Sequence, residues 1–145
     1  MANPITVVVL LAITSCRLVQ SEKADFEEDS RTFIWLLAED CRTSETTNDD
    51  IKAVVDDEKD MSYASKCILA CISEHFGLFT EDGKFNFDVA FEFFDAMIED
   101  DDEKKEMRDR LIKKCKDIED EDKCERAYKL NRCMDEVDKE FQAED

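Results

Sequence analysis

The sequence is poor in the residues that break helices and in the residue that most often catalyses reactions at neutral pH. Its 145 residues include two glycines, one proline and one histidine. With so few turn-forming residues and no alternating strand pattern, we expect an all-α protein. Any His-based catalysis would need His75, and no Gly-x-Ser-x-Gly motif is present. Paired carboxylates stay open as an alternative, but none lies in a recognisable cleft motif, so we expect no enzyme activity.

Basic residues are also scarce, at 20 lysines and arginines against 39 acidic residues, and the formal net charge is −19. Such a chain repels phosphate backbones and anionic membranes, which argues against nucleic-acid partners and against peripheral membrane binding. No Cys-x2-Cys motif or Cys/His cluster with metal-ligand spacing is present, so we expect neither a metal nor a cofactor.

Long hydrophobic runs are absent apart from one near the N-terminus, over residues 5–13. This run is too short to span a bilayer but has the length of a signal-peptide core, and Val19 and Ser21 suit positions −3 and −1 of a cleavage site. We predict a signal peptide over residues 1–21 and one secreted domain over residues 22–145, without a stable membrane anchor. Cleavage removes one arginine and no acid, so the mature chain carries a charge of −20.

Six cysteines remain after cleavage, because the seventh, Cys16, lies in the predicted signal peptide. In an oxidising compartment this even number indicates a disulfide framework, for which 15 pairings exist. Two pairs are excluded by their spacing on predicted helices, Cys67 with Cys71 and Cys124 with Cys133. Each exclusion removes three pairings and one pairing is shared, so ten pairings stay open. The six residues are Cys41, Cys67, Cys71, Cys115, Cys124 and Cys133.

The spacing C-x25-C-x3-C-x43-C-x8-C-x8-C resembles that of the insect odorant-binding protein family, notably in the x3 and the final x8. The segment from Phe76 to Phe85 is also similar to family sequence. The resemblance implies a compact bundle of about six helices around an internal apolar cavity. It also implies three disulfides, Cys41–Cys71, Cys67–Cys124 and Cys115–Cys133.

Six helices are predicted from apolar spacing and capping residues. The first places Phe26, Ser30, Phe33, Leu37 and Cys41 along one buried stripe. Trp35 lies off that stripe and is interpreted as a partly covered surface aromatic, with a homodimer contact as the alternative. Asn48, Ser62 and Asn86 are the expected N-caps of the second, third and fourth helices, and Gly77 is expected to end the third. The predicted ranges are 26–42, 49–56, 62–76, 87–99, 102–116 and 122–141.

The fourth predicted helix is apolar over most of its circumference. Its acids, at positions 88, 92, 95 and 99, occupy a narrow arc, and the apolar residues cover about 220° at 100° per residue. This arc is wider than one helix–helix interface requires. Other helices, a ligand, or both must therefore cover it.

The ten phenylalanines and five methionines favour either a plain core or an adaptable apolar cavity, and the family resemblance favours the cavity. The resemblance implies a carrier of a small hydrophobic molecule such as an odorant or pheromone. The alternative is a non-olfactory scavenger or interaction protein of saliva or reproductive fluid. Tyr128 is the predicted hydrogen-bonding residue. The predicted wall consists of Phe33, Leu37, Met61, Ile68, Ile72, Phe76, Phe91, Phe94, Met97, Leu111, Ile112 and Tyr128.

His75 is expected near the C-terminus of the third helix, where the helix dipole favours its charged form. Because some family members release ligand at acid pH, the resemblance makes a pH switch one interpretation of this residue. An exposed histidine at a helix end is the other.

Overall fold

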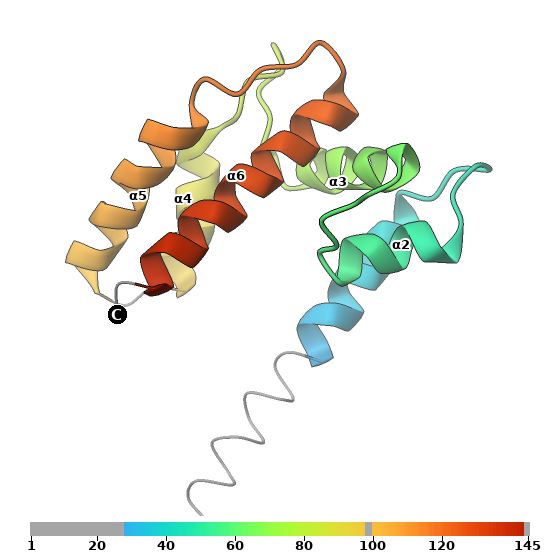
Figure 1. Cartoon of the computed structure of the whole chain (residues 1–145), viewed down its shortest axis with the longest axis horizontal. Coiled ribbons are helices and arrows are strands. Elements are labelled where there is room, and N and C mark those ends of the chain that lie inside the picture. The colour runs from blue at the N-terminus through green and yellow to red at the C-terminus, as the bar shows by residue number, and fades with distance from the viewer. Residues whose placement is uncertain (1–27, 98–99, 144–145) are drawn as a thin grey trace, which may run out of the picture.

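The computed structural model describes residues 28–97 and 100–143, apart from the side chains of residues 93–97. The predicted signal peptide lies outside these residues. The described chain is helical, with one isolated β-bridge between Phe79 and Phe85, and it confirms the all-α prediction (Figure 1). In chain order the helices are residues 28–40, α2 (Asn48–Val55), α3 (Tyr63–His75), α4 (Phe87–Met97), α5 (Asp101–Cys115) and α6 (Lys123–Ala143).

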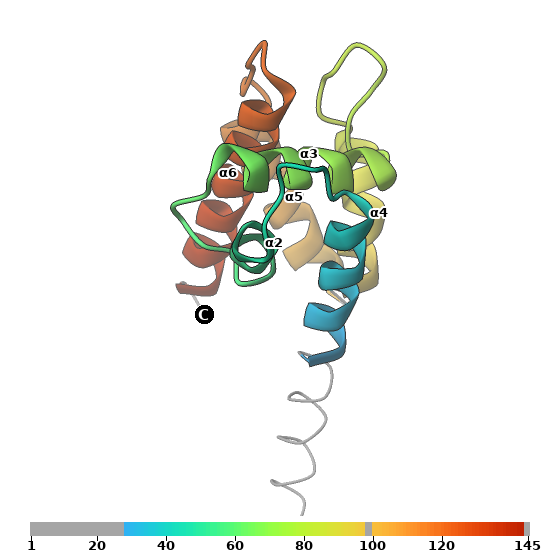
Figure 2. The ribbon, with the colours of Figure 1, turned by 90° about the vertical axis from the view of Figure 1, so that its right-hand side faces the viewer.

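Helix α6 joins the two halves of the bundle. It packs against α3 on one side and α5 on the other, while α2 packs against α3 and α4 against α5. Figure 2 shows α3 running across the direction of helix 28–40. None of the helices in the described chain is both long and apolar enough to cross a membrane.

Helix α2 begins with a capping box rather than at the expected Asn48. The Thr47 hydroxyl accepts a hydrogen bond from the Asp50 amide (3.2 Å), and the Asp50 carboxylate accepts one from the Thr47 amide (2.8 Å). The prediction for Asn48 is wrong because the reciprocal pair satisfies two amides at once. The Asn48 side chain instead accepts a hydrogen bond from Arg42 (2.6 Å).

The other predicted caps are confirmed. Ser62 accepts a hydrogen bond from the Ser65 amide (3.1 Å), and Asn86 accepts one from the Val89 amide (3.3 Å). Gly77 has a φ of 68°, a left-handed conformation that favours glycine after a helix. These caps fix where α3 and α4 begin and how the chain leaves α3.

The buried face of helix 28–40 differs from the predicted stripe. Ser30 is exposed and the Phe33 side chain is 54% exposed, while Phe26 lies outside the described residues. The disulfide of Cys41 holds the end of this helix against α3. Ala38 and Ile34, one and two turns before Cys41, therefore lie on the side of the helix that faces the core. Trp35 is half-buried and packs against the first group of core residues, which agrees with its interpretation as a partly covered aromatic, although it lies on the buried side of the helix. The residues that face the core are Ile34, Trp35, Ala38 and Cys41.

Two core clusters stabilise the bundle by burying apolar surface. We define the first cluster as Ala38, Cys41, Ile51, Val54, Met61 and Ile68. We define the second cluster as Phe91, Met107, Leu111, Cys115, Leu130 and Val137. Helix α6 reaches both, because Leu130 is in the second cluster and Tyr128 packs against the first.

The three disulfides have the pairing that the family resemblance implied. Cys41–Cys71 ties the end of helix 28–40 to α3, with Cα atoms 5.9 Å apart. Cys67–Cys124 ties α3 to α6, with Cα atoms 4.4 Å apart, and Cys115–Cys133 ties α5 to α6, at 6.0 Å. Each helix from α3 onward except α4 is therefore linked covalently to a neighbour.

Candidate functional site

The predicted ligand wall is divided between the two core clusters. Met61 and Ile68 are buried in the first cluster, where Ile72 packs against them from the next turn of α3. Phe91 and Leu111 are buried in the second cluster, at 4% and 3% exposure. These residues are positioned by α3, α4 and α5, and in this conformation they contact other side chains of the protein.

Four other predicted wall residues lie at the edges of the clusters. The rings of Phe33 and Phe76 are 6.4 Å apart, so the end of α3 meets helix 28–40 through an aromatic pair. Leu37 is half-buried on the same helix, and Ile112 on α5 is 37% exposed. The partly exposed members of this group offer apolar surface to a ligand without any loss of core packing.

The last turns of α4 hold Phe94 and Met97, whose side chains lie outside the described residues. Helix α4 packs against α5, and its Phe91 shares the second cluster with Leu130 of α6. One side of α4 is used by Phe87 and Phe91, whose rings are 5.9 Å apart beside the second cluster. In the described part of α4, Ala90 and Phe91 are buried and Phe87 and Val89 are half-buried.

Tyr128 has a hydrogen-bond partner within the protein. Its hydroxyl donates to the backbone carbonyl of Lys59, and the Lys66 ammonium lies 4.5 Å from the centre of its ring. The ring also borders a surface hollow of about 580 Å³ with Lys129 and Arg132 on its rim. A ligand that bonds this hydroxyl must use the oxygen lone pairs or replace the Lys59 contact.

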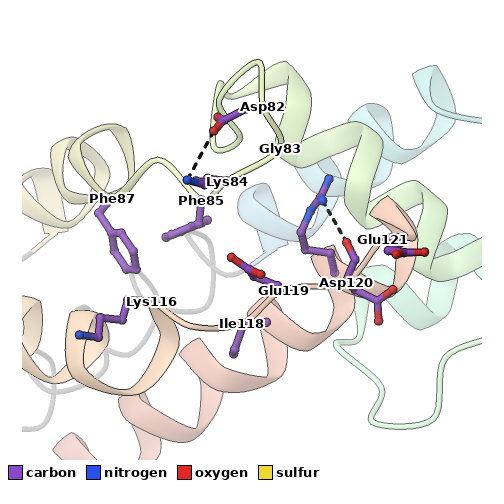
Figure 3. Close-up of a pocket in the computed structure, with 11 residues that line it drawn as sticks. Asp82, Gly83, Lys84, Phe85, Phe87, Lys116, Ile118, Glu119, Asp120 and Glu121 are labelled. Carbon is purple, nitrogen blue, oxygen red and sulfur yellow. Dashed lines mark hydrogen bonds and ion pairs between the residues drawn. The ribbon is translucent and has the colours of Figure 1, made fainter.

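A second hollow, of about 600 Å³, lies between the α3–α4 loop and the α5–α6 loop (Figure 3). It shares no described residue with the predicted wall. Its apolar floor comes from Phe85, Phe87 and Ile118, and the two phenylalanine rings meet edge to face with centroids 4.9 Å apart. The alternation of Phe85 and Phe87 about Asn86 is the one sequence signal that could have indicated it.

Arg126 of α6 shapes this second hollow. Its guanidinium donates to the carbonyl of Asp120 (3.1 Å) and lies 5.4 Å from the centre of the Phe79 ring. The same group lies under Gly83, where an added Cβ would approach it to 2.9 Å. Arg126 therefore holds the α3–α4 loop against the α5–α6 loop, and the glycine is required for that close approach.

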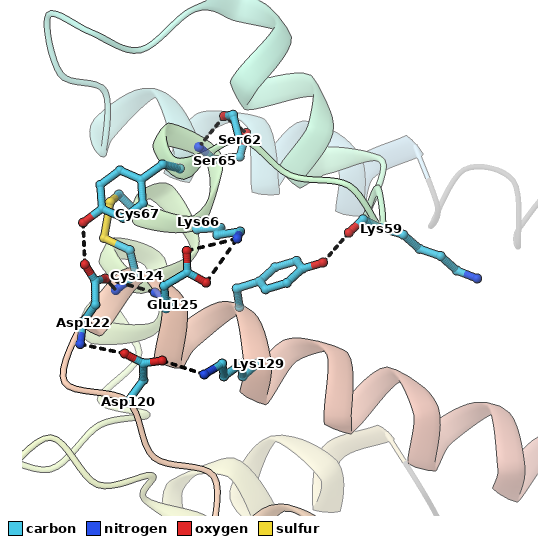
Figure 4. A network of polar contacts seen from close by, with 12 residues as sticks. Lys59, Ser62, Ser65, Lys66, Cys67, Asp120, Asp122, Cys124, Glu125 and Lys129 are labelled. Carbon is cyan, nitrogen blue, oxygen red and sulfur yellow. Dashed lines mark hydrogen bonds and ion pairs between the residues drawn. A yellow bond between two sulfur atoms is a disulfide. The ribbon is translucent and has the colours of Figure 1, made fainter.

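A polar seam joins α3 to α6 around the Cys67–Cys124 disulfide (Figure 4). The Tyr63 hydroxyl donates to Asp122 (2.7 Å), which lowers the pKa of that carboxyl and raises the pKa of the tyrosine. The Lys66 ammonium contacts both carboxylate oxygens of Glu125 at 3.1 Å. Asp122 also accepts hydrogen bonds from the first amides of α6, so the seam positions this helix rather than binding a ligand.

His75 is exposed at the last residue of α3, as predicted from sequence. Its Nδ1 atom lies 3.8 Å from Cys41 Sγ, beside the Cys41–Cys71 disulfide. Helical spacing on α3 puts Cys71 and His75 on one face, and the disulfide brings Cys41 to the same place. This grouping of a histidine with two cysteines was not visible in the linear spacing.

Comparison with known proteins identifies the family. A family model described as the PBP/GOBP family, which is the insect odorant-binding protein family, matches residues 23–137. No curated protein and no solved structure matches the chain. Proteins of this family are binding proteins rather than enzymes. With the all-helical fold, the three disulfides and a match over most of the sequence, the chain belongs to the PBP/GOBP family.

Proposed function

We propose that this protein is a secreted carrier that holds a small hydrophobic ligand, such as an odorant or pheromone, in an internal pocket. The proposal includes transport of that ligand through aqueous lymph. Membership of the PBP/GOBP family supports it, since the family consists of small soluble odorant- and pheromone-binding proteins. The strong negative charge keeps such a carrier soluble and away from anionic membranes.

The sequence of helix α4 supports this proposal most directly. By sequence it is apolar over about 220° of its circumference, an arc wider than one helix–helix interface requires. An apolar ligand that covered part of this arc would gain about 25 cal/mol for each Å² of apolar surface removed from water. Phe94 and Met97 are the residues of α4 proposed to contact it.

The remaining proposed contacts lie outside α4. Phe33 and Phe76 offer an aromatic pair with exposed ring surface, and Ile112 offers exposed surface on α5. The buried members of the predicted wall form the backing of the proposed site, and they are Met61, Ile68, Phe91 and Leu111. Half-buried Leu37, Ile72 and Tyr128 complete the proposed wall.

Displacement of a fluorescent apolar probe from the mature chain tests the proposal. We expect saturable uptake of the probe and its displacement by apolar odorants. Phe33→Ala should weaken uptake about tenfold, because a phenylalanine contact contributes about 1.5 kcal/mol. Leu36→Ala is the matched control, since Leu36 is 60% exposed on the same helix and lies outside the predicted wall, so it should leave uptake unchanged.

Phe85→Ala distinguishes the predicted wall from the hollow between the loops. Weakening by Phe85→Ala alone would move the site to that hollow and overturn the proposed wall, while the carrier function would stand. Absence of any saturable uptake by the folded mature chain would contradict the carrier function itself.

A further inference from the structure

We propose that Cys41, Cys71 and His75 form a binding site for a soft divalent metal ion when a thiol reduces the Cys41–Cys71 disulfide. The ligand atoms of these three residues all lie within 4.8 Å of one another. Two thiolates and an imidazole are ligands that zinc prefers in proteins. In the oxidised protein the sulfurs are bonded to each other and carry no thiolate charge, so the site forms only on reduction.

The distances in the structure already approach those of a metal tetrahedron. Zinc bonds of about 2.3 Å to sulfur and about 2.0 Å to nitrogen give a sulfur-to-nitrogen edge of about 3.6 Å. The Cys41 Sγ to His75 Nδ1 distance is 3.8 Å. The Cα atoms of Cys41 and Cys71 are 5.9 Å apart. Rotation of the freed side chains can therefore open the sulfur pair to the tetrahedral edge of about 3.8 Å without separation of the helices.

The elements that carry the three ligands are fixed independently of this disulfide. Cys71 and His75 are one turn apart on α3, which Cys67–Cys124 still ties to α6 after reduction. Cys41 stays at the end of helix 28–40, where Ala38 is fully buried in the first cluster. Three protein ligands leave the fourth position of the tetrahedron to water.

Reduction proceeds by two thiol exchanges that balance. A thiolate of the reductant attacks Cys71 Sγ, the sulfur–sulfur bond breaks, and Cys41 leaves as a thiolate next to His75. A second reductant thiolate then attacks the mixed disulfide and frees Cys71, so the reductant becomes a disulfide and two electrons reach the protein. An N–H of the His75 ring can donate to the departing Cys41 sulfur, and the chain has no other histidine to help the remaining disulfides.

Graded reduction of the full mature chain with dithiothreitol, followed by anaerobic removal of the reductant and addition of Co²⁺, tests the proposal. Alkylation and peptide mapping should show that Cys41 and Cys71 are freed first. Co²⁺ should then show thiolate-to-metal charge transfer and the visible bands of tetrahedral coordination, neither of which the oxidised protein gives. His75→Ala should weaken Co²⁺ binding at least about tenfold, since even indirect metal contacts have effects of that size.

The matched control moves the imidazole by one residue, in the double variant Glu74→His and His75→Ala. The imidazole at position 74 lies off the helix face that carries Cys71 and position 75, so this variant should not restore tight Co²⁺ binding. Three results would each overturn the proposal: earlier opening of another disulfide, absence of the charge-transfer band, or equal Co²⁺ affinity in wild type and His75→Ala. The order of reduction is measured on the wild-type chain and so does not depend on how a variant folds.

Discussion

Gly83 is the residue whose replacement most directly tests the contact between the two loops. Its φ is 77°, and an added Cβ would lie 2.9 Å from Arg126 Nη2. Gly83→Ala should lower the free energy of unfolding by more than the about 1–2 kcal/mol expected for left-handed backbone alone. Urea unfolding measures the change. Gly77→Ala supplies the backbone cost alone, since its φ is 68° and its Cβ would meet nothing within 4 Å.

We attribute the difference in unfolding free energy between the two glycine variants to contact of the added methyl group with the guanidinium of Arg126. In an Arg126→Ala background, the two substitutions should therefore cost the same. A Gly83→Ala variant that matches Gly77→Ala in the wild-type background would show that Arg126 moves aside freely.

Asp50 links the cap of α2 to the start of α3, and its carboxyl pKa is lowered, chiefly by the Ser62 hydroxyl and then by the Thr47 amide. A carboxyl whose pKa is lower in the folded state stabilises the protein above its unfolded pKa and stops doing so as pH falls through the folded value. Asp50→Asn should cost about 1 kcal/mol at pH 7. The difference in stability between this variant and wild type should close below about pH 4, where the Asp50 carboxyl becomes protonated.

Thermal unfolding between pH 3 and pH 7 measures that gap. Asp117→Asn is the control, because Asp117 is exposed and its side chain makes no hydrogen bond or ion pair among residues 28–97 and 100–143. A gap that stays constant across this range would contradict the role of the Asp50 charge.

The α3–α6 seam is held by one well-covered ion pair and by more exposed ones. The Lys66 side chain is 19% exposed and lies between Glu125 and the Tyr128 ring. Lys66→Met keeps the apolar stem but removes the charge, and it should lower the free energy of unfolding by about 1 kcal/mol. Lys123→Met should change it by less than about 0.5 kcal/mol, because the Lys123–Glu74 pair is 59% and 50% exposed. Equal effects in denaturant titrations would contradict this ranking.

The helices were largely predictable from sequence because their signals are local. Ser62, Asn86 and Gly77 mark helix ends through short-range hydrogen bonds and backbone conformation, and all three predictions are confirmed. The buried face of helix 28–40 was not predictable from its own periodicity. Which side of this helix is buried depends on where the Cys41–Cys71 disulfide holds it against α3, and that is a tertiary constraint.

At the scale of the whole molecule, the disulfide pairing followed from the family resemblance, whereas helix geometry alone left ten pairings open. The hollow between the two loops was missed because its floor combines Phe85 and Phe87 with Ile118, which lies more than 30 residues away. Local periodicity carries no information on how two loops meet. The predicted wall residues were chosen by their apolar character. Six of them belong to the two clusters or pack directly against them.

The net charge of −20 expected for the mature chain should make its stability depend on salt. Repulsion among the acidic residues opposes compaction, and added salt screens it over a Debye length of about 10 Å at 0.1 M. The melting temperature should therefore rise by a few degrees between 10 and 200 mM NaCl, even though exposed pairs such as Lys123–Glu74 weaken. A triple variant, Asp117→Asn, Glu119→Gln and Glu121→Gln, removes three charges from one exposed loop. It should melt higher than wild type at 10 mM and respond less to salt, because its self-repulsion is smaller. A wild-type melting temperature that falls with salt would mean that the surface ion pairs outweigh the repulsion.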